Sequence, residues 1–147
     1  MPANATSTIH FHFLKGANAL SERTRLKAFI ATLFKREGKK LDEIHYIFCS
    51  DDYLLEINRQ HLKHDYYTDI ITFGLSEPGA PITAEIYISV DRVRDNAANF
   101  DATFTKELHR VIFHGALHLC GYKDKSKKDA ELMRKMEEKY LSLYFSA

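Results

Sequence analysis

The order of strand-like and helix-like segments is the feature that most restricts how this 147-residue chain can fold. Residues 9–13 alternate as Ile-His-Phe-His-Phe, which is the two-residue period of a β-strand. Further runs of β-branched, aromatic or alternating residues predict strands at 44–49, 68–73 and 85–90. Capping residues and helical spacing of apolar residues predict helices at about 21–38, 51–62, 91–100, 104–120 and 130–143. The expected N-caps are Ser21, the Ser50-Asp51-Asp52 segment and Asp91.

These segments give the order β-α-β-α-β-β-α-α-α, without an internal repeat or a long linker. Helices between the early strands favour parallel pairing there, whereas the Pro78-Gly79-Ala80-Pro81 turn lets the last two strands form a hairpin. We therefore predict an α+β fold, a small mixed four-stranded β-sheet covered by about five helices. A chain of this length can bury a core without covalent cross-links, so residues 1–147 are expected to form a single domain.

Charge and cysteine content exclude several classes of protein. Lys and Arg total 21 against 20 Asp and Glu, so the net charge does not indicate a nucleic-acid partner, although a local patch still could. The two cysteines, Cys49 and Cys120, are too few for a disulfide framework and fit a reducing compartment. No apolar run reaches about 18 residues, and residues 1–6 lack the features of a secretion signal. We expect a cytoplasmic protein that does not span a membrane.

The segment from His114 to Asp124 contains the pattern that most clearly indicates chemistry, His-x3-His-x2-Gly-x2-Asp. On a helix, His114 and His118 project from one face, one turn apart, and can bind the same metal ion. Gly121 can adopt the left-handed conformation that ends a helix, which lets Asp124 turn back as a third ligand. Three protein ligands leave one position for water, as in catalytic zinc sites. The sequence therefore predicts that residues 1–147 form a single metallohydrolase-like domain, a metal-dependent hydrolase with its site on a long helix and the following turn.

This spacing also matches the metzincin metalloprotease site, with Asp124 in place of the third histidine. In those enzymes the general base is the Glu directly after the first histidine, and that position is Gly115 here. A protease mechanism that depends on this carboxylate is not available. A metzincin-like metalloprotease stays as a weaker alternative.

Three blocks of residues between positions 57 and 122 point to one family. They are Ile57-Asn58-Arg59 followed by Asp65-x-x-Thr68-Asp69-Ile70-x-x-Phe73, then Glu85-Ile86-x-Ile88-Ser89, and finally His114-Gly115-x-Leu117-His118-Leu119-x-Gly121-Tyr122. With these blocks in this order, the chain resembles the YbeY family of metal-dependent endoribonucleases.

The resemblance implies a function that composition does not indicate. It implies a single-strand-specific endoribonuclease with one zinc ion per chain, acting in ribosomal RNA processing at the 3′ end of small-subunit rRNA and in ribosome quality control. RNA would be the main partner, with ribosomal small-subunit proteins and an assembly GTPase as further partners. The other alternative is a non-catalytic ribosome assembly or RNA-binding factor with a structural metal.

Two positions depart from the family's pattern. The usual third ligand is a histidine at the position of Asp124, but carboxylate oxygen also binds zinc well. The family usually carries a functional arginine where this chain has Leu62. Arg59 and Lys63 are nearby in sequence, and we predict that they take over its catalytic role.

Basic side chains close to the predicted ligands are candidates for RNA binding. They are His64 in the polar stretch before the third strand, and Lys123, Lys125, Lys127 and Lys128 in the turn after the ligand helix. A solvated loop is the alternative explanation for the lysine run.

Other polar residues have simpler expectations. Glu107 lies about two turns before His114 and could support the ligands from the same helix face. His109 is expected at the surface, and His10 and His12 are expected to form the polar face of a strand without chemistry. Asp69 is expected either to cap backbone or to contact substrate.

Overall fold

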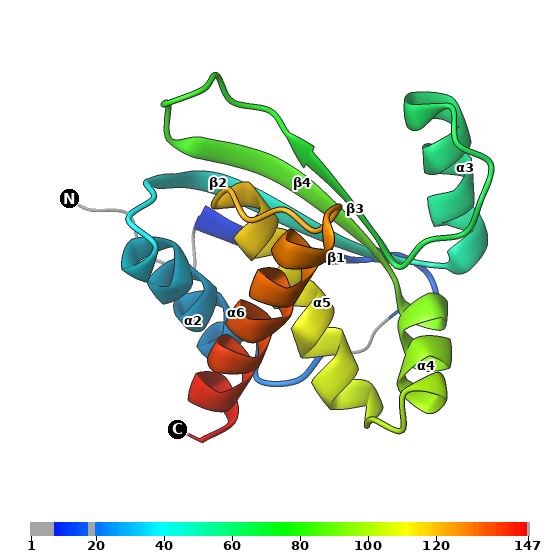
Figure 1. Ribbon diagram of the computed structural model, residues 1–147. Helices are drawn as coiled ribbons and strands as arrows, with labels where there is room; N and C mark the ends of the chain where they lie inside the picture. Colours follow the sequence, from blue (N-terminus) through cyan, green and yellow to red (C-terminus); the bar gives the residue numbers. More distant parts are fainter. Residues whose placement is uncertain (1–7, 18–19, 147) are drawn as a thin grey trace.

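The computed structural model describes residues 8–17 and 20–146, and its elements follow the predicted order (Figure 1). The strands are β1 (Ile9–Phe13), β2 (Leu41–Cys49), β3 (Ile70–Gly74) and β4 (Ile82–Ser89). The helices are α2 (Arg23–Arg36), α3 (Asp51–Leu62), α4 (Val90–Asn99), α5 (Phe104–Leu119) and α6 (Lys127–Phe145). Residues 1–6, which we expected to lack a secretion signal, lie outside the described residues.

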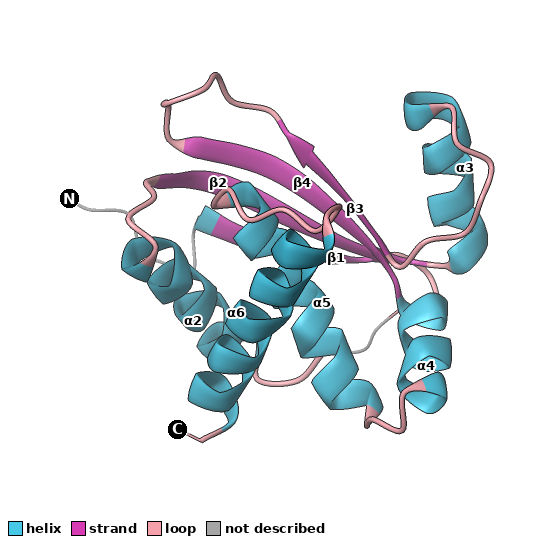
Figure 2. Ribbon diagram, viewed as in Figure 1, coloured by secondary structure: helices cyan, strands magenta, loops and turns pink. Residues whose placement is uncertain are grey.

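The four strands form one mixed sheet in the order β1-β2-β4-β3 (Figure 2). β2 pairs in parallel with both β1 and β4, whereas β3 and β4 form the antiparallel hairpin around the Pro78 turn. Parallel neighbours need a crossover connection, and α2 supplies it between β1 and β2. The predicted α+β fold, with a four-stranded sheet and five helices in the described part of the chain, is confirmed.

The two faces of the sheet are covered unequally. Because side chains alternate along a strand, Ile44, Tyr46 and Phe48 of β2 point into the main core, which also contains buried residues of α2, α5 and α6. The opposite face has a smaller apolar cluster in which Leu54 of α3 packs with Cys49 and Ile71.

The ends of two helices differ from the predictions. Ser21 does not cap α2, since the residue before the helix is Glu22, in a left-handed conformation and without a side-chain cap. Asp91 lies inside α4, and the cap is Ser89, whose hydroxyl accepts a hydrogen bond from the Arg92 backbone N–H. β4 therefore continues into α4 with Ser89 serving as the last residue of one and the cap of the other.

Two further features of the described residues concern the cysteines and the apolar character of the helices. Cys49 and Cys120 are both free and buried, and burial raises the pKa of each thiol to about 12. Among the described residues, no helix combines the length and apolar character needed to cross a membrane.

Candidate active site

A cavity of about 310 Å³ lies between α5 and the beginning of β3. Its wall contains the three predicted ligands together with polar and apolar neighbours: Thr68, Asp69, Ile70, Thr72, Arg110, Val111, His114, His118 and Asp124. The structure thus brings His114, His118 and Asp124 to one pocket.

Local backbone geometry explains how Asp124 reaches this pocket. α5 ends at Leu119, and Gly121 follows with a φ of 109°, in the region that favours glycine. The backbone N–H of Tyr122 donates to Leu117 O at 3.1 Å, which reverses the chain against the end of the helix. As a result, Asp124 Oδ2 lies 3.3 Å from His114 Nε2.

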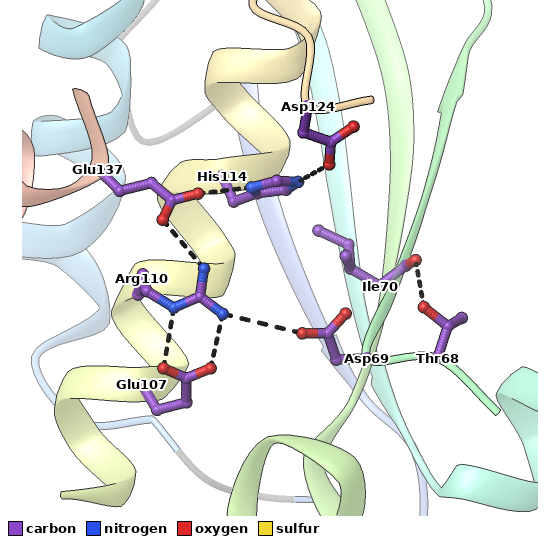
Figure 3. A network of polar contacts seen from close by, with 8 residues as sticks. All are labelled: Thr68, Asp69, Ile70, Glu107, Arg110, His114, Asp124 and Glu137. Atoms are coloured by element: carbon purple, nitrogen blue, oxygen red, sulfur yellow. Dashed lines mark hydrogen bonds and ion pairs between the residues drawn. The ribbon is translucent and has the colours of Figure 1, made fainter. Parts of the chain in front are cut away.

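The imidazole of His114 is held from its other side by α6 (Figure 3). His114 Nδ1 donates to Glu137 Oε2 at 2.6 Å, and Glu137 is only 2% exposed. This contact leaves Nε2 directed towards Asp124 and the pocket. A carboxylate on the far nitrogen is the usual way in which proteins orient a metal-binding histidine.

The pKa values of this pair reflect competing effects. Burial lowers the pKa of His114, but the hydrogen bond and charge of Glu137, together with the charge of Asp124, outweigh it and raise the pKa. Burial also raises the pKa of Glu137, but His114 and Arg110 outweigh it, and the pKa falls below its ordinary value. Both shifts favour the charged forms.

Arg110 connects this pair to two further carboxylates. Its guanidinium donates to Glu107 through two nitrogens, at 2.8 and 2.7 Å, and to Glu137 Oε1 at 3.0 Å. Asp69 Oδ2 lies 4.0 Å away on the opposite side of the pocket. Burial lowers the pKa of Arg110, but the two glutamates raise it above its ordinary value, so the side chain stays charged. Glu107 therefore supports His114 only indirectly, through Arg110 and Glu137.

Asp69 directs a carboxylate into the pocket from the segment just before β3 (Figure 3). Burial raises its pKa, while the charges of Arg110 and His114 oppose that shift. Its backbone carbonyl accepts a hydrogen bond from Ser89 N at 2.9 Å, which fixes the segment against β4. The main chain of Asp69 thus bonds to backbone, and its side chain is placed to contact a substrate in the pocket.

Gly115 explains why no glutamate follows the first histidine. A Cβ at this position would lie 3.0 Å from Ile70 Cδ1 and 3.2 Å from two carbons of Ile86. α5 therefore packs directly on the sheet at this residue, against Ile70, which also lines the pocket. A glutamate here would collide with the apolar side chains of Ile70 and Ile86.

The other predicted functional residues lie elsewhere. Arg59 at the end of α3 forms an ion pair with Asp65, and this contact raises its pKa. Lys63 follows α3 in a left-handed conformation, and the ring of His64 stacks on Tyr66 at 5.2 Å. None of Arg59, Lys63 and His64 lines the pocket. Their roles stay predictions.

The turn after α5 exposes the predicted lysines. The exposed residues are Lys123, Lys125, Lys127 and Lys128. Lys123 and Lys125 flank Asp124 in sequence, and Tyr122 packs under the turn with its hydroxyl donating to Glu37 at 2.8 Å. The lysines are therefore beside the pocket, without lining it.

Two residues of the helices were not foreseen correctly. His109 was expected at the surface but is 6% exposed, with its ring stacked on Tyr144 of α6. Glu137 was not identified, although the sequence contained a signal for it. Glu137 lies four residues after Met133 and three before Tyr140, so it occupies the apolar face of a predicted helix.

Three side chains that could bind one metal ion come together outside the pocket, on β1 and β2. Within residues 8–17 and 20–146, the set of three that could hold a metal ion, with atoms within 4.8 Å of one another, is His10, Glu43 and His45. His118 lines the pocket with an exposed side chain but does not complete such a set with His114 and Asp124. The assignment of His114, His118 and Asp124 as metal ligands stays a prediction.

Together, the fold and the pocket define an α+β protein with a hydrolase-like site of histidines, carboxylates and a buried arginine. Residues 15–144 match the family described as Endoribonuclease YbeY. The chain belongs to this family, so the predicted resemblance and the predicted class of hydrolase, an endoribonuclease, are confirmed.

Relatives with the same name cover most of the chain. Endoribonuclease YbeY of Cytophaga hutchinsonii is 52% identical over 124 residues, which are 84% of this chain and 87% of the relative. Endoribonuclease YbeY of Phocaeicola vulgatus is 56% identical over 106 residues, 72% of this chain and 76% of the relative. The solution structure of TM1509 from Thermotoga maritima has a TM-score of 0.68 and 32% identity, covering 94% of this chain and 89% of that one.

Proposed function

We propose that this protein cleaves single-stranded RNA with the help of one zinc ion bound by His114, His118 and Asp124. Its role would be the maturation of the 3′ end of small-subunit ribosomal RNA and ribosome quality control, in the cytoplasm, in contact with small-subunit proteins and an assembly GTPase. The observation that carries the proposal is the 3.3 Å contact of His114 Nε2 with Asp124 Oδ2, in a pocket that His118 also lines.

The donor set suits zinc. Two imidazoles and a carboxylate are common zinc ligands, and they leave a position for water. His114 Nδ1 is occupied by Glu137, so Nε2 is the nitrogen available to an ion. The exposed side chain of His118 can rotate towards the pair without displacing core residues. When bound, zinc would lower the pKa of a water molecule towards about 7 and act as a Lewis acid on phosphate.

The remaining pocket residues have roles that follow from their charge and position. We assign proton acceptance from the attacking water to Asp69, since Gly115 replaces the usual glutamate and Asp69 presents a carboxylate to the pocket. The charged guanidinium of Arg110 faces the same space and opposes the negative charge that grows on phosphate. Thr68 and Thr72 also line the wall, and we assign donation to phosphate oxygen to their hydroxyls. The Thr68 hydroxyl would exchange its 3.5 Å contact with Ile70 O for this.

RNA outside the pocket would meet basic residues on two sides. Lys123, Lys125, Lys127 and Lys128 are exposed beside Asp124 and suit the phosphate backbone. Arg59, Lys63 and His64 precede the segment that leads into Asp69, so RNA extending from the pocket along this segment would reach them. We propose that Arg59 and Lys63 contribute to cleavage by holding the RNA.

The test compares Asp124→Ala with Asp95→Ala, a matched change at an exposed aspartate of α4. Metal content, melting temperature and cleavage of single-stranded RNA are measured for both variants and the wild type. We expect Asp124→Ala to lose zinc and to cleave about 10- to 100-fold more slowly, with little change in melting temperature. Full zinc content and full cleavage in Asp124→Ala would contradict the proposal.

The same samples separate the alternatives. Loss of folding together with zinc in Asp124→Ala would indicate a structural metal, as in a non-catalytic assembly factor. The match to the family Endoribonuclease YbeY does not favour the metzincin-like metalloprotease, so we expect no digestion of casein. In the same assay, Asp69→Asn is expected to retain zinc and lose cleavage, because the amide cannot accept the proton.

A further inference from the structure

A second group of histidines lies on the face of the sheet opposite to the pocket. His45 of β2 alternates with Ile44 and Tyr46, which are buried in the main core, so it points to the other side. Residue His10 of β1 is the register partner of His45, and Glu43 precedes His45 by two positions on the same face. In the described part of the chain, α3 packs on this face against the β3 and β4 side, through the cluster around Leu54.

The side chains of this group converge on one oxygen atom. Glu43 Oε1 lies 2.9 Å from His45 Nε2 and 3.2 Å from His10 Nε2. The two imidazole rings are stacked, with centroids 4.6 Å apart and planes inclined by 15°. All three side chains are partly exposed, at 33% to 46%, so solvent and ions have access.

These separations are close to those of a zinc coordination sphere. With zinc–ligand distances of 2.0–2.2 Å, neighbouring ligands of a tetrahedral ion lie about 3.3–3.6 Å apart. Because an imidazole binds a metal in the plane of its ring, the stacked rings of His10 and His45 would turn about their side-chain torsions to meet at an ion, and their partial exposure leaves room for this. The fourth position would face solvent and take water.

His12 supports this arrangement from behind. His12 Nε2 lies 2.7 Å from His45 Nδ1, the nitrogen opposite to the one that faces Glu43. Metal-binding histidines are commonly fixed in this way through the nitrogen that does not bind the ion. The contact orients His45 so that its Nε2 is directed at the oxygen of Glu43.

We propose that His10, Glu43 and His45 form a second zinc site, separate from the pocket, that joins the edge strand β1 to β2. His10 and His12 were expected to do no chemistry, because their alternation with phenylalanine predicts only a polar strand face. Bound zinc would add a further link between these two strands, beside the β-ladder and ring contacts such as that of Phe13 with Phe48. Its role is to stabilise the sheet, and it does not depend on RNA cleavage.

The experiment removes the pocket ligands and then counts zinc. A variant with His118→Ala and Asp124→Ala serves as the parent, and zinc is added in a calorimetric titration. We expect the parent to bind one equivalent of zinc, and its melting temperature to rise by roughly 5–10 °C when zinc is 100 times the dissociation constant. Adding His45→Gln is expected to abolish both effects.

Two further variants make the result specific. Glu43→Gln in the parent keeps the size of a half-exposed side chain and should weaken zinc binding, whereas His61→Gln removes an exposed histidine outside the group and should leave zinc binding unchanged. Wild-type protein with His45→Gln alone should still cleave RNA. The proposal is overturned if the parent binds no zinc, or if His45→Gln and Glu43→Gln bind zinc as tightly as the parent.

Discussion

Replacing Glu137 by glutamine tests whether the orientation of His114 governs the pocket. Glutamine has nearly the same volume, so the packing of α6 is preserved while the negative charge is lost. In the native protein Glu137 accepts hydrogen bonds from His114 Nδ1 at 2.6 Å and from Arg110 Nη1 at 3.0 Å. Both donors would then face a neutral amide in a site that is almost closed to solvent.

The magnitude follows from these two contacts. Hydrogen bonds to charged groups contribute about 1 kcal/mol more than neutral ones, so losing the charge at two donors should cost about 2 kcal/mol of folding free energy. For a domain of this size that lowers the melting temperature by roughly 4–8 °C. Loss of a carboxylate behind a metal-binding histidine weakens metal affinity about 10- to 100-fold, or about 1.4–2.7 kcal/mol.

The assay measures zinc dissociation from the pocket by competition with a chromophoric chelator, and melting by calorimetry with and without zinc. His45→Gln is included in all samples so that the proposed second site does not contribute. Glu138→Gln is the matched control, because Glu138 is the exposed neighbour on the same helix.

An unchanged zinc affinity in Glu137→Gln would refute the reasoning, since His114 would then be oriented equally well without the charge. Weaker zinc binding in Glu138→Gln of the same size would also refute it, because the effect would then come from the net charge of α6.

Two further predictions concern the core around the ligand helix. Gly115→Ala should lower stability by about 1 kcal/mol, since overpacking against Ile70 and Ile86 outweighs the gain in helix propensity. Urea unfolding should show this loss, and adding Ile70→Val should restore most of it. Full stability in Gly115→Ala would mean that α5 can shift away from the sheet without cost in free energy. Burial lowers the pKa of His109, despite its hydrogen bond to Thr105, so the unfolded chain binds a proton near pH 6.5 before the folded protein does. The free energy of unfolding should therefore fall as the pH decreases below 6.5, and it should fall less in His109→Gln. Urea unfolding at pH 7.5 and 5.5 measures this, and an equal fall in His109→Gln and the wild type would contradict it.

The sequence pattern predicts the elements of the fold better than their ends. β4 was expected to begin at residue 85 but begins at Ile82, and β2 begins at Leu41 instead of residue 44. Leu41 pairs with Ile82, so each strand is extended by the other. Alternation along one segment contains no information about the length of its partner.

The residues of the site were likewise predicted only in part. His114, His118 and Asp124 were predicted to meet because their spacing acts within one helix and its following turn. Glu137 and Asp69 come from α6 and from the start of β3, and their approach depends on how these elements pack on α5. Only a tertiary arrangement brings such residues together, so local spacing could not identify them as partners of the histidines.

The contribution of α6 has a consequence for the newly made protein. This helix follows all the other described elements in the chain, so it leaves the ribosome after them. Until it docks, His114 lacks the carboxylate that orients its ring, and Arg110 lacks one of its two glutamate partners. An unfinished chain would therefore be inactive towards the ribosomal RNA close to it during its own synthesis. Under the proposed function, cleavage would begin only once α6 has been translated and has docked on α5.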